Sequence, residues 1–424
     1  MNNPRQIAAD ALLKIEIDKA YSNIILNNFL TISDLSNVDK ALCTSIFYGV
    51  LDRKITLDYV IKKFITSPIK KIKPYTLTVL RCAIYQIMFM EKIPVSATVN
   101  EAVKLIKQSN ESYNSGFVNG VLRSFLREGI SLPNGNDINS ISIMYSCPAQ
   151  IVTTLIRDLG LDNAKKFLEN SLSTPPTFIR VNTNKITSEK LSIMLRNHHI
   201  SSIKTKTPNA LSLINLKNIE QIDEFKNGLF HVEDLSCQQA LDALDIKIDS
   251  RVLDVCAAPG GKTFTASQLS YLGQVISCDL YEHRVRLIED GAKRLELKNI
   301  ETHVQDATEF NGHFGLFDRV ICDVPCSGLG VIRRKPDIKY KNTGQFDDLV
   351  CIQKKILVNA LKYLKSGGKL LYSTCTLNSN ENRNVVDFVL ENGSDFELIY
   401  EHTYLPHLDS GDGFYAAVIR KKEW

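Results

Sequence analysis

The spacing of hydrophobic residues changes along the 424-residue chain. In residues 1–128, apolar side chains recur three or four positions apart, for example over 7–15 and 79–88, and prolines separate the periodic runs. This spacing is typical of amphipathic helices, so an all-helical first domain is predicted. The following stretch, 129–140, is rich in Gly, Asn and Ser and predicts a linker.

A mixed pattern between residues 141 and 235 predicts a small α+β subdomain. Its predicted elements are a helix over 149–170, a strand over 178–182, a helix over 188–197 and strands over 210–214 and 228–232. The prolines at 175 and 176 end the first of these helices.

From residue 251 onward, strand-like and helix-like runs alternate, which predicts an open parallel α/β sheet. The strands are expected over 252–256, 274–279, 300–304, 317–323, 369–374, 396–400 and 414–419, with helices such as 282–295 and 346–364 between them. We therefore predict three parts: a helical domain over 1–140, the small subdomain over 141–235 and an α/β domain over 236–424.

Composition adds little until the charges are located. Hydrophobic residues make up 44% and charged residues 23% of the chain, which is ordinary for a globular protein. Residues 1–140 hold 17 Lys and Arg against 12 Asp and Glu, so the basic excess lies in the first third. Much of it falls in one basic stretch: Lys62, Lys63, Lys70, Lys71, Lys73 and Arg81. From charge alone, a solvated helix face is preferred over a phosphate-binding surface.

The cysteines and apolar runs indicate the compartment. The ten cysteines include no Cys-x-x-Cys pair, so no zinc or other metal site is expected. No run of about 18 apolar residues predicts a membrane span, and the N-terminus lacks the apolar segment of a secretory signal. A reducing cytoplasmic location is predicted.

A turn of small residues directly follows the first strand of the α/β domain. It reads Cys256, Ala257, Ala258, Pro259, Gly260, Gly261, Lys262 and Thr263. A phosphate-binding P-loop would need glycine where Cys256 stands, and no Gly-x-Gly-x-x-Gly occurs, so a nucleotide triphosphatase is the minor interpretation. Acids follow three successive strands at Asp254, Asp279 and Asp306, where a ribose and an adenine can be bound.

Two cysteines follow the next two strands. Cys326 stands in Asp323-Val324-Pro325-Cys326, and Cys375 follows Ser373-Thr374. A cysteine taken singly is more often a core residue. A thiolate would have a chemical role in methylating cytosine. Its addition to carbon 6 makes carbon 5 nucleophilic enough to accept a methyl group. Asp323 is the candidate to assist at nitrogen 3, which would need a raised pKa. Methylation of an exocyclic amine or a ribose hydroxyl gives no reason for two thiols.

These motifs resemble the RNA 5-methylcytosine methyltransferase family. The resemblance implies that S-adenosylmethionine binds at the turn 256–262, with Asp279 at the ribose, Asp306 near the adenine and Asp323 beside the methyl group and target base. It further implies that Cys375 is the nucleophile and that Cys326 assists release of the methylated RNA. Matching segments also occur at 179–183, 380–382 and 412–415, whereas Glu233-Asp234 stands where relatives have Gln-Asp.

Residues 1–140 resemble the NusB-like RNA-binding domain of one subfamily, most clearly at Phe117-Val118-Asn119-Gly120. The resemblance implies a Rossmann-like methyltransferase domain, an RRM-like subdomain and a cytosine in 16S ribosomal RNA as substrate. It also turns the basic stretch into an expected RNA contact, and no DNA or membrane partner is expected. The protein is expected to act as a monomer. A transfer RNA cytosine-5 methyltransferase and a non-catalytic RNA-binding assembly factor remain alternatives, while a DNA cytosine methyltransferase is disfavoured.

Overall fold

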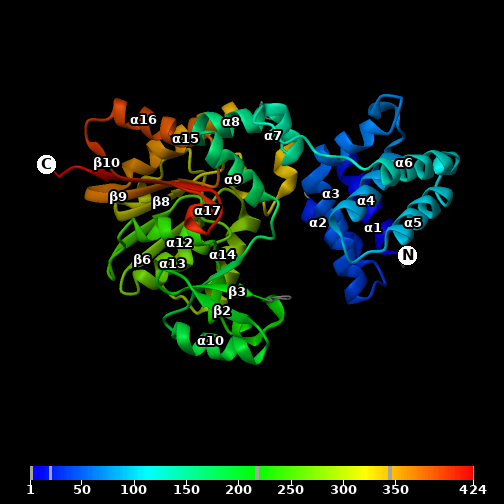
Figure 1. Cartoon of the computed structure of the whole chain (residues 1–424). Helices are drawn as coiled ribbons and strands as arrows, with labels where there is room; N and C mark the ends of the chain where they lie inside the picture. Colours follow the sequence, from blue (N-terminus) through cyan, green and yellow to red (C-terminus); the bar gives the residue numbers. More distant parts are fainter. Residues whose placement is uncertain (1–2, 19–21, 215–218, 342–345, 424) are drawn as a thin grey trace. The chain divides into compact units, whose positions relative to one another are not determined.

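The computed structural model describes residues 3–18, 22–214, 219–341 and 346–423. The chain forms two compact units (Figure 1). Unit 1 comprises Met1–Leu172 together with Arg334–Lys341, and unit 2 comprises Ser173–Arg333 together with Asn342–Trp424. No helix in the described ranges combines the length and apolarity needed to cross a membrane.

The first part of unit 1 is helical, as the periodicity predicts. Its helices are α1 (Pro4–Asp18), α2 (Ser22–Thr31), α3 (Asn37–Lys63), α4 (Pro74–Phe89), α5 (Val95–Lys107) and α6 (Ser115–Glu128). They share one apolar core, in which Phe47, Leu80 and Leu122 are fully buried. Residues 129–137 contain neither helix nor strand, which agrees with the predicted linker.

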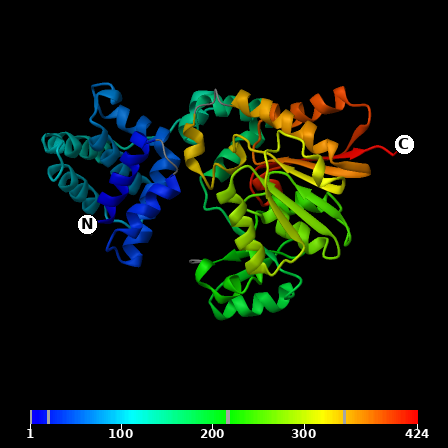
Figure 2. The ribbon, with the colours of Figure 1, turned by 180° about the vertical axis from the view of Figure 1, so that it is seen from behind.

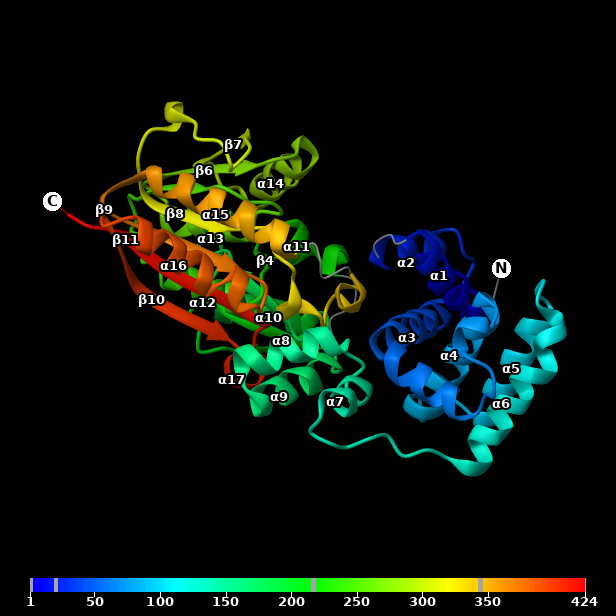
Figure 3. The same cartoon turned by 90° about the horizontal axis from the view of Figure 1, so that it is seen from above.

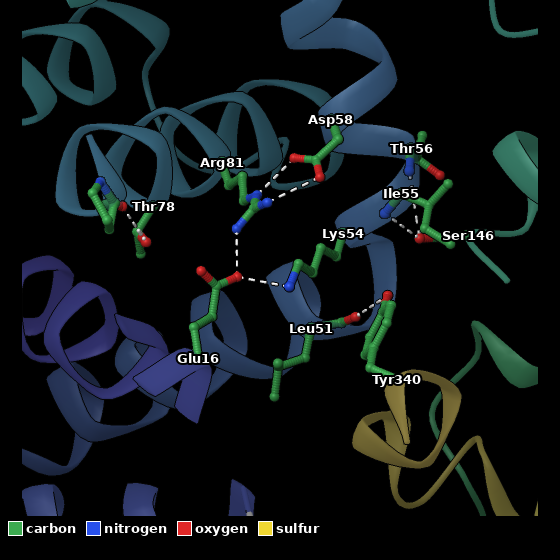
Figure 4. Close-up of polar contacts among 11 residues, drawn as sticks. Glu16, Leu51, Lys54, Ile55, Thr56, Asp58, Thr78, Arg81, Ser146 and Tyr340 are labelled. Carbon is green, nitrogen blue, oxygen red and sulfur yellow. Dashed lines mark hydrogen bonds and ion pairs between the residues drawn. The ribbon is translucent and has the colours of Figure 1, made fainter. Parts of the chain in front are cut away.

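Three further helices complete the N-terminal stretch of unit 1: α7 (Ile138–Met144), α8 (Ala149–Leu159) and α9 (Leu161–Ser171). The prediction of one helix over 149–170 is wrong, because Gly160 adopts φ +76° and separates α8 from α9. Hydrogen bonds join α7 and the residues after it to α3, since Thr56 Oγ1 donates to the Ile143 carbonyl at 2.6 Å. Ser146 Oγ accepts from the Ile55 amide at 2.9 Å (Figure 4).

A short 3₁₀ helix from much later in the sequence, η6 (Pro336–Tyr340), also belongs to unit 1. Tyr340 donates its hydroxyl to the Leu51 carbonyl at 2.9 Å (Figure 4), and Lys339 donates to the Asp52 carbonyl at 2.8 Å. The pattern of hydrophobic residues gives no sign of this long-range packing.

Unit 2 begins with a small antiparallel sheet of order β2-β3-β1-β4. Its elements are β1 (Thr177–Val181), α10 (Ser188–Asn197), β2 (Ser201–Lys204), β3 (Ala210–Ile214), α11 (Asp223–Lys226) and β4 (Phe230–Val232). Strand β2 was not predicted because its Ser-Ser-Ile-Lys sequence is largely exposed. Helix α10 lies beside this sheet (Figure 2). Its Leu191 and Leu195 are buried in a core shared with the strands.

The main sheet has seven strands in the order β10-β11-β9-β8-β5-β6-β7. The strands are β5 (Arg251–Asp254), β6 (Gln274–Asp279), β7 (Ile300–Val304), β8 (Phe317–Asp323), β9 (Leu364–Thr374), β10 (Phe396–Tyr404) and β11 (Phe414–Lys421). The first five are parallel, as predicted. Strand β11 departs from the predicted parallel arrangement: it runs antiparallel to both of its neighbours, β9 and β10, because β10 returns to it after a short connection that contains α17 (Pro406–Asp409).

Helices cover both faces of this sheet. On one face lie α15 (Phe346–Lys362) and α16 (Arg383–Asn392) (Figure 3). On the other lie α12 (Leu235–Asp242) and α13 (Gly261–Leu269), while α14 (Glu282–Leu295) packs beside β6 and β7. The Rossmann-like α/β fold is therefore confirmed, and the strand ends that carry the candidate residues meet along one edge.

Candidate functional site

The small-residue turn lies between β5 and the N-terminus of α13. Gly260 adopts φ +111°, and a Cβ atom there would lie 2.3 Å from the Phe264 ring, so only glycine fits. The Ala257 amide donates to the Cys278 carbonyl at 2.9 Å, which ties the turn to β6. The first amides of α13 face the same edge and can bind a polar or anionic group.

Asp279 and the turn are directly connected. Its Oδ2 accepts the Ala258 amide at 3.1 Å, and its Oδ1 lies 3.3 Å from Arg284 Nη1. Arg284 also donates to the Ala258 carbonyl at 2.8 Å. Asp279 is therefore held rigidly at the end of β6, where it can accept ribose hydroxyls.

The other two acids of the series behave differently. Asp306 follows β7 and accepts the Thr308 amide and hydroxyl on Oδ1, which leaves Oδ2 as an acceptor. Asp254 is buried and accepts the Thr263 hydroxyl at 2.7 Å. Burial raises the pKa of Asp254 to about 7. Asp254 therefore anchors α13 beneath the site, while Asp306 lies further out along the edge.

Lys262 is turned inward and pairs with Asp323. Its Nζ lies 2.7 Å from Asp323 Oδ2, and the Ser373 hydroxyl donates to Asp323 Oδ1 at 2.8 Å. Burial alone would lower the pKa of Lys262, but Asp323 outweighs burial and the net pKa is well above its usual value. Lys262 thus connects the cofactor turn to the end of β8.

The two cysteines meet. Asp323 and Ser373 are paired in register on β8 and β9, so the segments that follow them are adjacent. The Cys326 and Cys375 sulfurs lie 3.2 Å apart, and both residues are partly buried. The hydrogen bond with Cys375, together with burial, raises the pKa of Cys326 well above its usual value.

Close backbone contacts surround the cysteines. The Gly330 amide donates to the Cys375 carbonyl at 3.0 Å, and the Gly413 amide donates to the Gly330 carbonyl at 3.0 Å. A Cβ atom at Gly330 would lie 2.0 Å from the Gly413 carbonyl oxygen. The Asp-Gly-Phe-Tyr segment at 412–415 is thereby explained as a packing requirement, and Asp412 pairs with buried Arg333 at 3.0 Å.

The segment at 179–183 also has a structural explanation. Asn182 Nδ2 donates to the carbonyls of Gly228 and Leu295, each at 2.9 Å. These bonds connect the small sheet to α14 within unit 2. Glu233, which departs from the expected Gln, is buried and accepts the Thr265 hydroxyl at 2.8 Å, so it too contacts α13.

One strongly connected residue was missed as a site candidate. Glu381 is fully buried and accepts hydrogen bonds from Ser327, which directly follows Cys326, and from Asn378 in the segment after Cys375. The Asn-Glu-Asn segment gave a signal, but the partner residue Ser327 lies 54 positions earlier in the sequence.

The basic stretch of unit 1 separates into two groups. Lys62, Lys63, Lys70, Lys71 and Lys73 are exposed and remain predicted RNA contacts. Arg81 does not belong with them, because its side chain is 7% exposed and binds Asp58 and Glu16 (Figure 4). The expectation that Arg81 contacts RNA together with these lysines is wrong. Its guanidinium is bound by two carboxylates on neighbouring helices, so it does not present its N–H groups to a phosphate.

Within the described residues, no group of three His, Cys, Asp or Glu side chains is arranged to hold a metal ion. All ten cysteines are free. The chemical groups at the sheet edge are therefore a small-residue turn, carboxylates at three strand ends and two adjoining thiols.

Comparisons with known proteins agree with this arrangement. A family model described as 16S rRNA methyltransferase RsmB/F matches residues 241–420, and the NusB family model matches residues 2–127. The chain is 36% identical to probable ribosomal RNA small subunit methyltransferase B of Bacillus subtilis, covering 99% of this chain and 98% of the relative. It is 31% identical to ribosomal RNA small subunit methyltransferase B of Proteus mirabilis, covering 99% of both. The solved structure of PH0851 shares the fold, with a TM-score of 0.81, 23% identity and 99% coverage of both chains.

Proposed function

Because the chain belongs to the RsmB/F family of 16S rRNA methyltransferases, we propose that it methylates carbon 5 of one cytosine in 16S ribosomal RNA. The single observation that carries this proposal is the 3.2 Å separation of the Cys326 and Cys375 sulfurs beside Asp323. Transfer to a nitrogen or a ribose oxygen would leave two adjoining thiols without a role.

S-adenosylmethionine supplies an electrophilic methyl group when it is bound. The residues that fit it are the turn 256–262, Asp279 for the ribose and Asp306 toward the adenine, because acceptors and helix amides lie along one edge. Gly260 allows the backbone to approach the cofactor closely, and Lys262 holds the turn against Asp323.

Cys375 is the proposed nucleophile. Its thiolate adds to carbon 6, and carbon 5 then takes the methyl group. The proton on carbon 5 is removed by a base that we do not assign, and the electron pair returns to the ring as the carbon 6–sulfur bond breaks. Cys326 is the proposed participant in that release, and its raised pKa keeps it as a thiol that can exchange a proton.

Asp323 is proposed to orient the target base. Its carboxylate pairs with the ammonium of Lys262, 2.7 Å away, and accepts the Ser373 hydroxyl. Asp323 is therefore set up to accept a hydrogen bond from the amine of cytosine. Donation of a proton to nitrogen 3 would require the Lys262 contact to open when RNA binds.

Labelled S-adenosylmethionine, naked 16S RNA and competing transfer RNA test the proposal in one reaction, followed by bisulfite mapping. The expected result is one protected cytosine in 16S RNA. Label on transfer RNA would support the proposed methyl transfer but contradict 16S ribosomal RNA as the substrate. No label on either RNA would support the non-catalytic assembly factor instead.

A further inference from the structure

Glu381 is a buried carboxylate located between the two cysteine-bearing segments. It ends the 3₁₀ helix η8 (Ser379–Glu381), which follows β9, and its side chain has no exposed area. Among the residues that the structure describes, no basic side chain forms an ion pair with it. A buried charge is costly unless hydrogen bonds compensate it, so its neighbours must supply them.

Four donors converge on the two oxygens of Glu381. Ser327 provides its amide at 2.8 Å and its hydroxyl at 2.6 Å. Asn378 Nδ2 and Gln353 Nε2 each donate at 3.1 Å. An acceptor-only group matches this set, whereas a glutamine would direct an N–H₂ group at other donors.

These donors come from the segments that carry the thiols. Ser327 directly follows Cys326, and its hydroxyl lies 2.7 Å from the hydroxyl of Thr376, which directly follows Cys375. Gln353 also donates to the carbonyl of Pro325, on the other side of Cys326, at 2.9 Å. Glu381 therefore holds the backbone on both sides of Cys326 against the end of β9.

We infer that Glu381 is a positioning residue that sets the separation of the Cys326 and Cys375 sulfurs, so that both reach the same base. This inference rests on the proposed two-cysteine chemistry. If Cys326 assists release of the adduct held by Cys375, the two sulfurs must lie close together, as their 3.2 Å separation allows. Among the described residues, no hydrogen bond joins Glu381 to either sulfur, so it acts through the neighbouring Ser327 and Thr376.

The rate of disulfide formation between Cys326 and Cys375 measures this positioning without RNA or cofactor. A diazene oxidant such as diamide takes two electrons and two protons from the thiols and becomes the hydrazine, while one disulfide forms. Tryptic mass spectrometry follows the Cys326–Cys375 peptide pair over time. The matched control is Glu224→Gln, which changes another buried glutamate of unit 2, on α11, that pairs with His198.

In Glu381→Gln, cross-linking is expected to slow about 10-fold because charge-assisted hydrogen bonds are lost. Methyl transfer is expected to lose about 10²-fold in kcat, with the KM for RNA little changed. Glu224→Gln should match the wild type in both assays. Wild-type cross-linking and kcat in Glu381→Gln would overturn the inference.

Two further outcomes remain interpretable. If Glu381→Gln does not fold by circular dichroism, Ser327→Ala replaces it, since this variant keeps the carboxylate and removes one donor; slower cross-linking supports the inference and an unchanged rate contradicts it. If methyl is found on another atom of the RNA, the proposed function fails, while the cross-linking rates still decide whether Glu381 sets the sulfur separation.

Discussion

Replacing Arg81 by methionine is expected to destabilise unit 1 without changing the affinity of the protein for 16S RNA. Arg81 on α4 donates two hydrogen bonds to Asp58 on α3, at 2.7 and 2.9 Å, and one to Glu16 on α1, at 2.6 Å (Figure 4). One guanidinium thus joins three helices. Burial alone would lower the pKa of Arg81, but the two carboxylates outweigh burial and raise it.

The loss of stability depends on how well the carboxylates of Glu16 and Asp58 are compensated once the guanidinium is removed. Breaking a buried ion pair leaves an uncompensated charge and costs about 3–5 kcal/mol. Glu16 keeps Lys54 at 2.7 Å, and the Asp58 side chain is 22% exposed, so water can partly replace the lost partner. The lower end, about 3 kcal/mol, is therefore expected for Arg81→Met.

Hydrogen exchange with mass spectrometry on the full chain measures this loss locally. Peptides from α3 and α4 should exchange about 10²-fold faster in Arg81→Met, since 3 kcal/mol lost from the opening free energy corresponds to that factor. The control is Arg127→Met, which removes an exposed arginine paired with Glu128. Unchanged protection in α3 and α4, or a loss of RNA affinity in Arg81→Met with normal protection, would contradict a structural role for Arg81.

Three further predictions concern unit 1 and the site. Changing Lys70, Lys71 and Lys73 together to glutamine should make the plot of log affinity for 16S RNA against log salt concentration less steep by about 2–3. Each exposed lysine that neutralises a phosphate releases counterions from the RNA. An unchanged slope in filter binding would exclude these lysines from the interface. Cys326→Ala should accumulate a covalent protein–RNA adduct, seen as a retarded band on denaturing gels; a variant that turns over with no such band would argue against a role in release. The pKa of Asp254 is raised to about 7, so its protonated form stabilises the fold below about pH 4 and this contribution is lost as pH rises through about 7. Asp254→Asn should flatten the fall in melting temperature between pH 5 and 7.5, and an unchanged slope would contradict the assignment.

Sequence patterns predicted most elements of the main sheet, and strands β6, β7 and β8 begin and end at the predicted residues. Strands β6 and β8 are mostly buried and carry apolar runs, whereas β7 lies at the edge of the sheet and is half-buried or exposed. The exposed strand β2 lacks this signal, and the break between α8 and α9 depends on a positive φ at Gly160. The reversed direction of β11 depends on the short connection from β10, which periodicity does not encode.

Candidate residues were predictable where they follow a strand, as Asp279, Cys326 and Cys375 do. Their partners were not, because hydrogen bonds between distant segments leave no local pattern. Lys262 was assigned to the cofactor turn, yet its charge is directed to Asp323, 61 residues away. In the same way, Arg81 looked like part of a basic stretch until its two carboxylates were seen.

Methylation at carbon 5 must expel the hydrogen on that carbon, so the reaction can be followed by the release of tritium from 16S RNA that carries [5-³H]cytidine. We expect one tritium released for each methyl group transferred by the wild type. We expect neither release nor transfer by Cys375→Ala, which should still bind S-adenosylmethionine. Methyl transfer without tritium release would contradict methylation at carbon 5, and full activity in Cys375→Ala would contradict the role of Cys375 as the nucleophile.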